Sequence, residues 1–188
     1  MIISAHRILQ LNTSHKIIEN LDPRELNPEG VGFDLRVAEV YRLSGEGYLG
    51  VENRKTPEIE KAADSAHKEI IIKPGEFVLV KTMEKVSLPA GKIQVEAGRE
   101  PALIMAHIYT RTTLFRCGIS LMATKVDPGY SGELTFAMAN LSPFPFKLEM
   151  GARIANIVFL EVLGELSRAY GGQWQGGRVT TEKMEKQV

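Results

Sequence analysis

Apolar and polar residues alternate in "SGELTFAMAN", which spans residues 131–140. Leu134, Phe136 and Met138 fall on one face of an extended chain, and Ala137 falls on the other. A period of two residues is typical of a β-strand that turns one face to the core. The pattern therefore predicts a half-buried strand directly after the Pro-Gly turn that precedes it.

Similar strand-like runs recur along the chain, and Pro or Gly separates several of them. The N-terminal stretch differs, because Ser4 precedes a short helical pattern and is placed to serve as its N-cap. Many short strands with one good helix favour a mainly β, single-domain fold, a distorted β-barrel or jelly roll, over any βαβ arrangement. The further strands are expected within residues 27–43, 77–81, 104–109, 119–126 and 146–163.

Two segments depart from this pattern. Residues 52–68 are charged and poorly patterned, which indicates a surface excursion with a short helix between strands. Residues 170–188 combine four glycines with Trp174 and Arg178. We therefore expect a barrel domain over residues 1–169, with the charged insertion inside it, followed by a flexible Gly-rich C-terminal arm.

The charge balance limits the classes of partner. The chain has 23 basic and 23 acidic residues, so it presents no basic field for nucleic acid or for an anionic membrane. Its single cysteine cannot form an intrachain disulfide, and its apolar runs are too short to cross a membrane. These features predict a cytoplasmic protein with no nucleic-acid or membrane partner. Phosphate chemistry would then depend on a few local arginines.

One compact set of hydrogen-bond donors fits that requirement. Arg111, Thr112, Thr113 and Arg116 place two guanidiniums and two hydroxyls within six residues. Such donors match the oxygens of a phosphate group. The alternative is a solvated turn whose arginines only cover the surface.

Three charged residues stand in apolar or rigid surroundings. Asp34 follows a Gly-rich turn inside a strand, where a buried acid needs a partner such as Arg36 or a hydrated metal. Arg153 lies among strand-forming residues and needs either an acid such as Glu149 or a bound anion. Asp127 precedes Pro-Gly, where its side chain could simply bond backbone amides of the turn. Each of the three has a structural and a functional interpretation.

The order of these motifs resembles a known superfamily. "GVGFDLRV", "RTTLFRCGI", "KVDPGYSGE", "GARIANIVF" and the Gly-rich tail are similar, in sequence order, to the five motifs of the dUTP pyrophosphatase and dCTP deaminase superfamily. The segment "VDPGYSG" is nearly identical to "IDPGYSG" of the deaminases, and the N-terminal helix also resembles that branch. The resemblance implies a homotrimer with active sites shared between chains.

One position separates the two reactions of the superfamily. The resemblance implies a glutamate at position 137 in a deaminase, where it moves protons at the cytosine ring, but this chain has Ala137. Loss of a general acid/base lowers a rate by on the order of a hundredfold to ten-thousandfold. The chain therefore resembles an archaeal-type dUTPase on a deaminase scaffold. Such an enzyme hydrolyses dUTP to dUMP and pyrophosphate with Mg²⁺, which limits uracil in DNA and supplies dUMP for dTMP synthesis.

The resemblance also implies the role of each residue. Asp127 would activate the attacking water, and Asp34 would hold the magnesium ion through water. Trp174 of the closing arm would stack on the base, while Tyr130 would lie under the deoxyribose. The remaining substrate-binding residues would be Arg111, Thr112, Thr113, Arg116, Arg153, Asn156 and Arg178.

Two rival functions remain open. The first is a dCTP deaminase, or a bifunctional dCTP deaminase and dUTPase, whose proton-transfer group has moved elsewhere. The second is a nucleotide-binding trimer without catalytic activity. Thr112, Thr113 and Asn156 depart from the usual serines and glutamine of the motifs, and Thr124 replaces a small residue of the dUTPases. These departures concern the pyrimidine contacts more than the activation of water.

Overall fold

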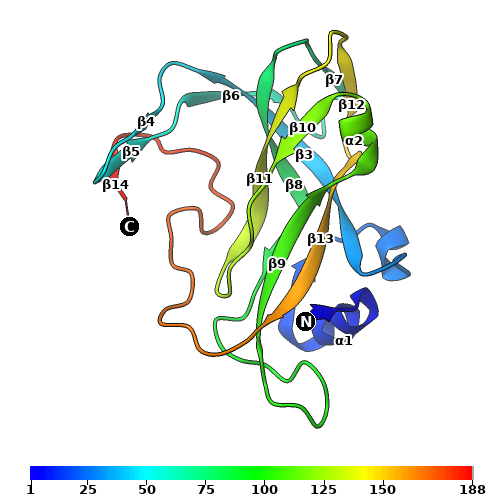
Figure 1. The fold of residues 1–188 in the computed structure, drawn as a ribbon. Helices are drawn as coiled ribbons and strands as arrows, with labels where there is room; N and C mark the ends of the chain where they lie inside the picture. Colours follow the sequence, from blue (N-terminus) through cyan, green and yellow to red (C-terminus); the bar gives the residue numbers. More distant parts are fainter. Residues whose placement is uncertain (188) are drawn as a thin grey trace.

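The computed structural model describes residues 1–187, and Val188, the last residue of the predicted arm, lies outside the described residues. The chain is mainly β, with few and short helices (Figure 1). The helical elements are α1 (Ala5–His15), the 3-10 turn η1 (Pro23–Leu26) and α2 (Thr112–Arg116). The strands are β1 (Ile2–Ile3), β2 (Ile18–Glu19), β3 (Gly32–Ser44), β4 (Tyr48–Leu49), β5 (Asn53–Lys55), β6 (Glu58–Ala63), β7 (Glu69–Ile72), β8 (Phe77–Ser87), β9 (Leu103–Thr110), β10 (Ile119–Met122), β11 (Ser131–Asn140), β12 (Phe146–Glu149), β13 (Arg153–Val162) and β14 (Glu185–Lys186).

One antiparallel sheet forms the body of the protein, in the order β1-β13-β3-β8-β11-β10. β2 adds to β8, β6 to β3 and β9 to β13, and the sheet curls into half a barrel. β3 connects the two halves, because its first residues pair with β13 and its later residues pair with β8 and β6. This architecture confirms the predicted mainly β, barrel-like class.

β11 confirms the alternation that the sequence shows. Leu134, Phe136 and Met138 are buried, while Ala137 on the opposite face is half-buried. Because β11 lies between β8 and β10, its apolar face joins the core that β3 and β13 also line. Phe33 and Phe159 meet edge to face in that core, with 6.2 Å between ring centroids.

The N-terminal helix forms where the sequence predicts it. The Ser4 hydroxyl accepts a hydrogen bond from the backbone nitrogen of Arg7 at 3.2 Å and so caps α1. Ile8 and Leu11 on its inner face are buried against the barrel. The helix ends at Lys16, which takes the left-handed conformation of a C-cap.

The charged insertion contains strands, so the expectation of a short helix in residues 52–68 is wrong. β5 and β6 account for most of its regular structure. β3 extends along β6 from Val40 to Ser44, and this stretch would otherwise leave backbone donors and acceptors unpaired. β6 satisfies them, and this tertiary pairing outweighs the weak strand pattern of its own sequence.

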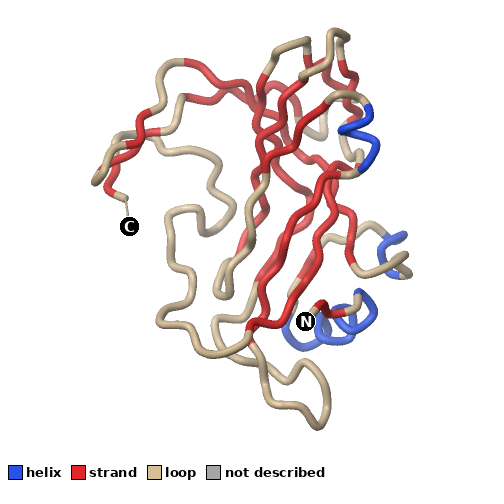
Figure 2. Tube along the Cα trace, viewed as in Figure 1, coloured by secondary structure: helices blue, strands red, loops and turns tan. Residues whose placement is uncertain are grey.

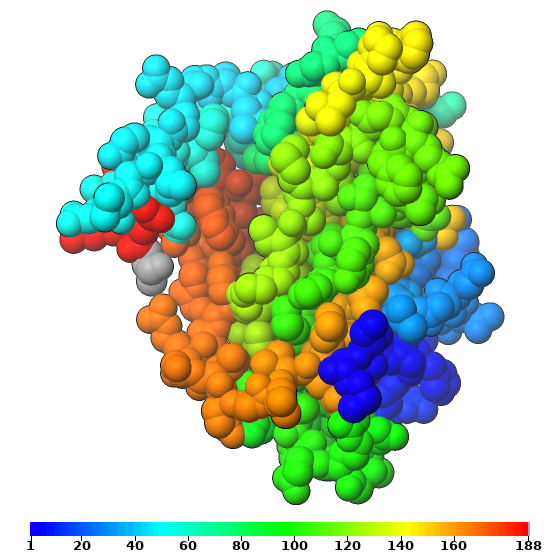
Figure 3. Space-filling model, in the orientation of Figure 1, coloured from blue at the N-terminus to red at the C-terminus, as the bar shows by residue number. Residues whose placement is uncertain are grey.

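The C-terminal arm, residues 170–187, runs beside β11 and ends at β14, which pairs with β5. Most of it has no regular secondary structure (Figure 2). The backbone nitrogen of Tyr170 donates to Pro128 O at 2.8 Å, and that of Gly176 donates to Ser131 O at 2.8 Å. The arm, orange to red in Figure 3, packs between β11 and the cyan strands of the insertion. In the structure, the arm is therefore packed against β11 and the insertion. The flexibility of the arm stays a prediction.

Gly132 permits this docking, and its replacement by alanine should release the arm. A Cβ at Gly132 would lie 2.3 Å from the backbone nitrogen of Gly177, a distance that no real contact reaches. We expect Gly132→Ala to make protease cleavage within the arm about tenfold faster, because cleavage follows the population of the open form. Gly171→Ala is the control, since a Cβ there meets nothing within 4 Å. Equal cleavage of the two variants would contradict the role of Gly132.

Candidate functional site

Asp34 of β3 is the centre of a cluster that three neighbouring strands assemble. Its Oδ2 accepts a hydrogen bond from Arg153 Nη1 at 3.1 Å and also pairs with Arg111. Its Oδ1 accepts a hydrogen bond from Asn156 Nδ2 at 3.0 Å. The register of β13 sets Asn156 opposite Asp34, and Arg111 follows the end of β9, the other neighbour of β13. The structure thus brings together four of the predicted site residues.

Glu25 completes this cluster, and sequence reasoning missed it. Its Oε2 accepts a hydrogen bond from the backbone nitrogen of Asp34 at 2.9 Å, and its Oε1 lies 3.8 Å from Arg153 Nη1. Burial raises the pKa of the Glu25 carboxyl. Glu25 lies in η1, where no pattern in "DPREL" distinguishes it from a surface acid. The two carboxylates and the guanidiniums of Arg111 and Arg153 balance in charge.

The Asp34 carboxylate does not fit the predicted metal role. Both of its oxygens already bind side-chain donors, and the residue is only 8% exposed. The two nearby guanidiniums would also repel a divalent cation. Within residues 1–187, no group of three or more His, Cys, Asp or Glu side chains is arranged to hold a metal ion. We therefore assign Asp34 to the positioning of Arg111 and Arg153.

α2 presents the predicted phosphate donors at the surface. Thr112, Thr113 and Arg116 are all exposed on this one-turn helix. Leu114, between them, is buried and anchors the helix to the core. Arg116 has no ion-pair partner within the described part of the chain, so its guanidinium is available to an anion. These three side chains fit the predicted role better than Arg111, whose charge Asp34 already neutralises.

Asp127 lies in the loop before β11, with its side chain 37% exposed and paired with Lys125. It borders a pocket of about 340 Å³ that Arg168 and Tyr170 also line. Neither of these two residues was predicted, although Arg168 comes shortly before the Gly-rich arm and Tyr170 is its first residue. A solvent-accessible carboxylate with no buried partner can accept a proton from water. Asp127 therefore has the exposure that its predicted role requires.

Tyr130 packs beside this pocket. Its ring meets that of Tyr170 edge to face, with 5.6 Å between centroids, and its hydroxyl donates to Glu133 O at 2.6 Å. Burial raises the pKa of the Tyr130 hydroxyl to about 12. Tyr130 is thus held as a neutral, rigid platform, which is compatible with the predicted position under a sugar.

Asp127 and α2 lie toward opposite ends of β11 within one chain. Asp127 precedes the first residue of β11, whereas α2 precedes Ile119, which pairs with Asn140 at the far end of β11 (Figure 1). A strand rises about 3.3 Å per residue, so roughly 30 Å separates the two ends of β11. Val126 also bridges to Ala106 of β9, six residues before Thr112, which brings Asp127 to within roughly 20 Å of α2. The two groups do not meet within one chain, and a site shared between two copies stays a prediction from the resemblance.

Ala137 lies on the outer face of β11, between two apolar cross-strand partners. In the sheet register it stands opposite Leu79 of β8 on one side and Met122 of β10 on the other. Glu133 shares this face but lies two pleat steps away, and its Oε2 is 3.5 Å from Lys81 Nζ. The immediate cross-strand neighbours of Ala137 therefore include no group that can transfer a proton.

The two predicted residues of the arm contact other parts of the same chain. The Trp174 ring lies under the Arg54 guanidinium, with 5.2 Å from Arg54 Cζ to the ring centroid. Arg178 Nη1 lies 3.0 Å from Glu185 Oε2. The docked arm thus holds Trp174 and Arg178 close together, but on the insertion rather than beside Asp127.

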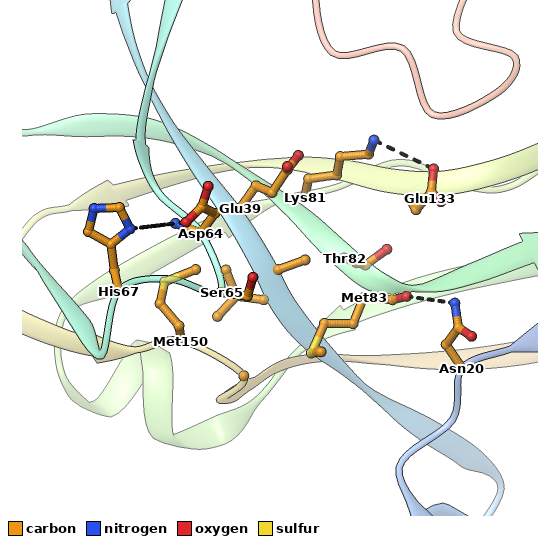
Figure 4. Close-up of a pocket in the computed structure, with 13 residues that line it drawn as sticks. Asn20, Glu39, Asp64, Ser65, His67, Lys81, Thr82, Met83, Glu133 and Met150 are labelled. Carbon is orange, nitrogen blue, oxygen red and sulfur yellow. Dashed lines mark hydrogen bonds and ion pairs between the residues drawn. The ribbon is translucent and has the colours of Figure 1, made fainter.

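A larger pocket, of about 750 Å³, opens on the outer face of β3 and β8 (Figure 4). Its lining includes none of the predicted site residues. Its lysine, Lys81, is already paired with Glu133, and His67 Nδ1 lies 3.1 Å from Asp64 Oδ1. Among residues 1–187 the pocket thus provides no unpaired cation to an anionic nucleotide, and its size alone does not make it the site.

The family model for dCTP deaminase-like proteins matches residues 2–162. The chain belongs to this family. A "dCTP deaminase, dUMP-forming" of Nocardioides sp. is 30% identical to it over 191 residues, which cover 95% of this chain and 89% of that protein. A dCTP deaminase of Pyrococcus horikoshii is 30% identical over 171 residues, which cover 90% of this chain and 92% of that protein. These findings confirm the superfamily that the motifs indicate.

A solved structure supports the same fold for this dCTP deaminase-like chain. The 2'-deoxycytidine 5'-triphosphate deaminase from Agrobacterium tumefaciens matches with a TM-score of 0.60 at 17% identity. The match covers 84% of this chain and 47% of that one, so the chain spans about half the length of that structure. At this identity the likeness concerns the fold alone. No helix within residues 1–187 is long and apolar enough to span a membrane.

Proposed function

We propose that this dCTP deaminase-like chain acts on a pyrimidine deoxynucleoside triphosphate, and that it hydrolyses dUTP to dUMP and pyrophosphate. The surroundings of Ala137 carry this proposal. Leu79 and Met122 flank it, so the outer face of β11 has no proton donor or acceptor where the deaminases are expected to have one. Hydrolysis of the triphosphate needs no such group at the base.

Asp127 supplies the chemistry that hydrolysis does need. Its carboxylate accepts a proton from a water molecule, and the water oxygen bonds to the α-phosphorus. The bond from that phosphorus to the bridging oxygen of the β-phosphate breaks, and pyrophosphate leaves. Arg116, Thr112 and Thr113 of a second copy hold the phosphates, as the resemblance implies for active sites shared between chains. The homotrimer is thus part of the proposal.

The magnesium ion remains a prediction from the resemblance. Because Asp34 is committed to two guanidiniums, we propose that any magnesium arrives with the triphosphate and is not held by that carboxylate. The cytoplasmic location and the absence of nucleic-acid partners also stay predictions.

dCTP deamination is the second candidate, and the names of the relatives support it better than they support hydrolysis. The Nocardioides and Pyrococcus relatives are both named dCTP deaminases, and the former is named dUMP-forming. For this chain to deaminate dCTP, a group other than residue 137 must move protons at the ring. Glu133, or a residue of a neighbouring copy, would have to reach the base. A nucleotide-binding trimer without activity is the third candidate.

Product analysis distinguishes these candidates. The purified chain is incubated separately with dUTP, dCTP and dTTP, and pyrophosphate, ammonia and the nucleotide products are quantified. We expect pyrophosphate and dUMP from dUTP, and no ammonia from dCTP. Ammonia with dUTP or dUMP from dCTP would establish deamination and overturn the argument from Ala137. Binding of nucleotides without any product would favour the third candidate.

A further inference from the structure

The end of the arm forms a small charged cluster with the insertion. β14 pairs with β5 in a register that sets Glu185 opposite Arg54. The Glu185 carboxylate accepts hydrogen bonds from Arg178 at 3.0 Å and from Gln173 Nε2 at 3.2 Å, and lies 3.9 Å from Arg54 Nε. Trp174 lies beneath Arg54. Two guanidiniums and an amide thus converge on one carboxylate, and an indole packs against one of the guanidiniums.

Arg54 is poorly satisfied in this arrangement. Its Nε and Nη2 atoms are buried and have no hydrogen-bond partner among residues 1–187. At 3.9 Å, the Glu185 oxygen is too far from Nε for a hydrogen bond. Buried donors on a charged group are costly when they stay unpaired. The Glu185 carboxylate therefore occupies this site but leaves two hydrogen-bond donors of Arg54 unsatisfied.

A phosphate group would match the cluster better than a carboxylate does. It carries more charge and more acceptor oxygens, so it can pair with Arg178 and with the free donors of Arg54 at once. The planar fork of an arginine is suited to such bidentate contacts. Trp174 adds a flat surface for a ring attached to the phosphate.

We propose that Arg54, Arg178 and Trp174 form a phosphate subsite of the nucleotide site, and that Glu185 occupies it as an internal competitor. The inference rests on the proposed function for the nature of the ligand, and it adds Arg54 and Glu185 to the residues that the motifs indicate. A nucleotide phosphate displaces Glu185 from the subsite, and β14 then separates from β5. The charged insertion thereby acquires a role in substrate binding.

A titration with inorganic tripolyphosphate tests this inference without any turnover. Trp174 is the only tryptophan of the chain, so its fluorescence reports directly on the subsite. We expect Glu185→Gln to bind tripolyphosphate about tenfold more tightly than the unmodified chain, because a site that is nine-tenths occupied by a competitor loses about tenfold in apparent affinity. Glu182→Gln is the matched control, since Glu182 is an exposed acid of the same arm with no ion pair among the described residues.

A second set of variants separates a binding role from a structural one. In the Glu185→Gln background, Arg54→Gln should weaken tripolyphosphate binding about tenfold to a hundredfold, the range for a hydrogen-bonded charge. Arg54→Lys should also weaken binding, because it keeps the charge but loses the fork. Equal or weaker binding by Glu185→Gln than by the unmodified chain would overturn the inference. So would Arg54 variants that bind as well as their parent.

The outcome is independent of the proposed hydrolysis. If the chain releases no pyrophosphate from dUTP but its variants follow this pattern with tripolyphosphate, then the proposed reaction fails and the subsite stands. If dUTP is hydrolysed but the variants bind alike, then the reaction stands and Glu185 only anchors the arm.

Discussion

Asp127→Asn is expected to lower kcat for dUTP hydrolysis by about a hundredfold to ten-thousandfold, the range for loss of a general base. Asparagine keeps the shape of the side chain but cannot accept a proton from water. The affinity for dUTP, measured by calorimetry on the inactive variant, should stay within about threefold, because Asp127 contacts the water rather than the phosphates. Initial rates of pyrophosphate release provide the first measurement.

Asp64→Asn serves as the control for this change. Asp64 is also a partly exposed aspartate with a cationic neighbour, Lys61, but it lies outside the predicted motifs. An Asp127→Asn enzyme that keeps more than about a tenth of the rate would remove Asp127 from the chemistry.

A mixture of two inactive variants tests whether neighbouring copies share the site. Asp127→Asn and Arg116→Ala chains, unfolded and refolded together in equal amounts, should recover about a quarter of the activity, because both intact residues meet at one site in four. No recovery would contradict a site shared between two copies.

The largest loss of stability is expected from Asp34→Ala. The change leaves the Arg111 and Arg153 guanidiniums beside each other without the carboxylate that now pairs with both. Removal of one partner from a buried ion pair costs about 3–5 kcal/mol, and we expect the lower end because both arginines are about one-third exposed. For a chain of this size, about 3 kcal/mol corresponds to a Tm lower by roughly 6–12 °C.

Thermal and urea unfolding of three variants, each compared with the unmodified chain, measure this effect. Asp34→Asn should lose less stability than Asp34→Ala, because the amide oxygen can still accept one of the hydrogen bonds. Asp64→Ala is the control, since its carboxylate pairs only at the surface and should change the free energy of unfolding by less than about 1 kcal/mol. Equal losses of unfolding free energy in Asp34→Ala and Asp64→Ala would show that the Asp34 cluster does not stabilise the packing of the strands.

Local patterns in the sequence predicted the elements whose form depends on near neighbours. The alternation in residues 131–140 gave β11, and Ser4 gave the start of α1. The strand expected at 119–126 is shorter than predicted. β10 covers only Ile119–Met122, because its pairing with β11 ends at Met122, opposite Ala137. β6 was missed because its pairing with β3, and not its own pattern, holds it extended.

For the candidate site, the residue types and their order along the chain indicated the family. Ala137 raised the question of whether the chain deaminates dCTP or hydrolyses dUTP. Only the tertiary structure decided which residues meet. The register of three strands brings Asp34 to Arg153 and Asn156, more than a hundred positions away, and adds Glu25, which no motif marks. The same register sets Asp127 and α2 at opposite ends of β11. The alternation of apolar and polar residues along a strand depends only on neighbouring residues. Strand order and register depend on the whole packed sheet, and strand order and register decide these distant contacts.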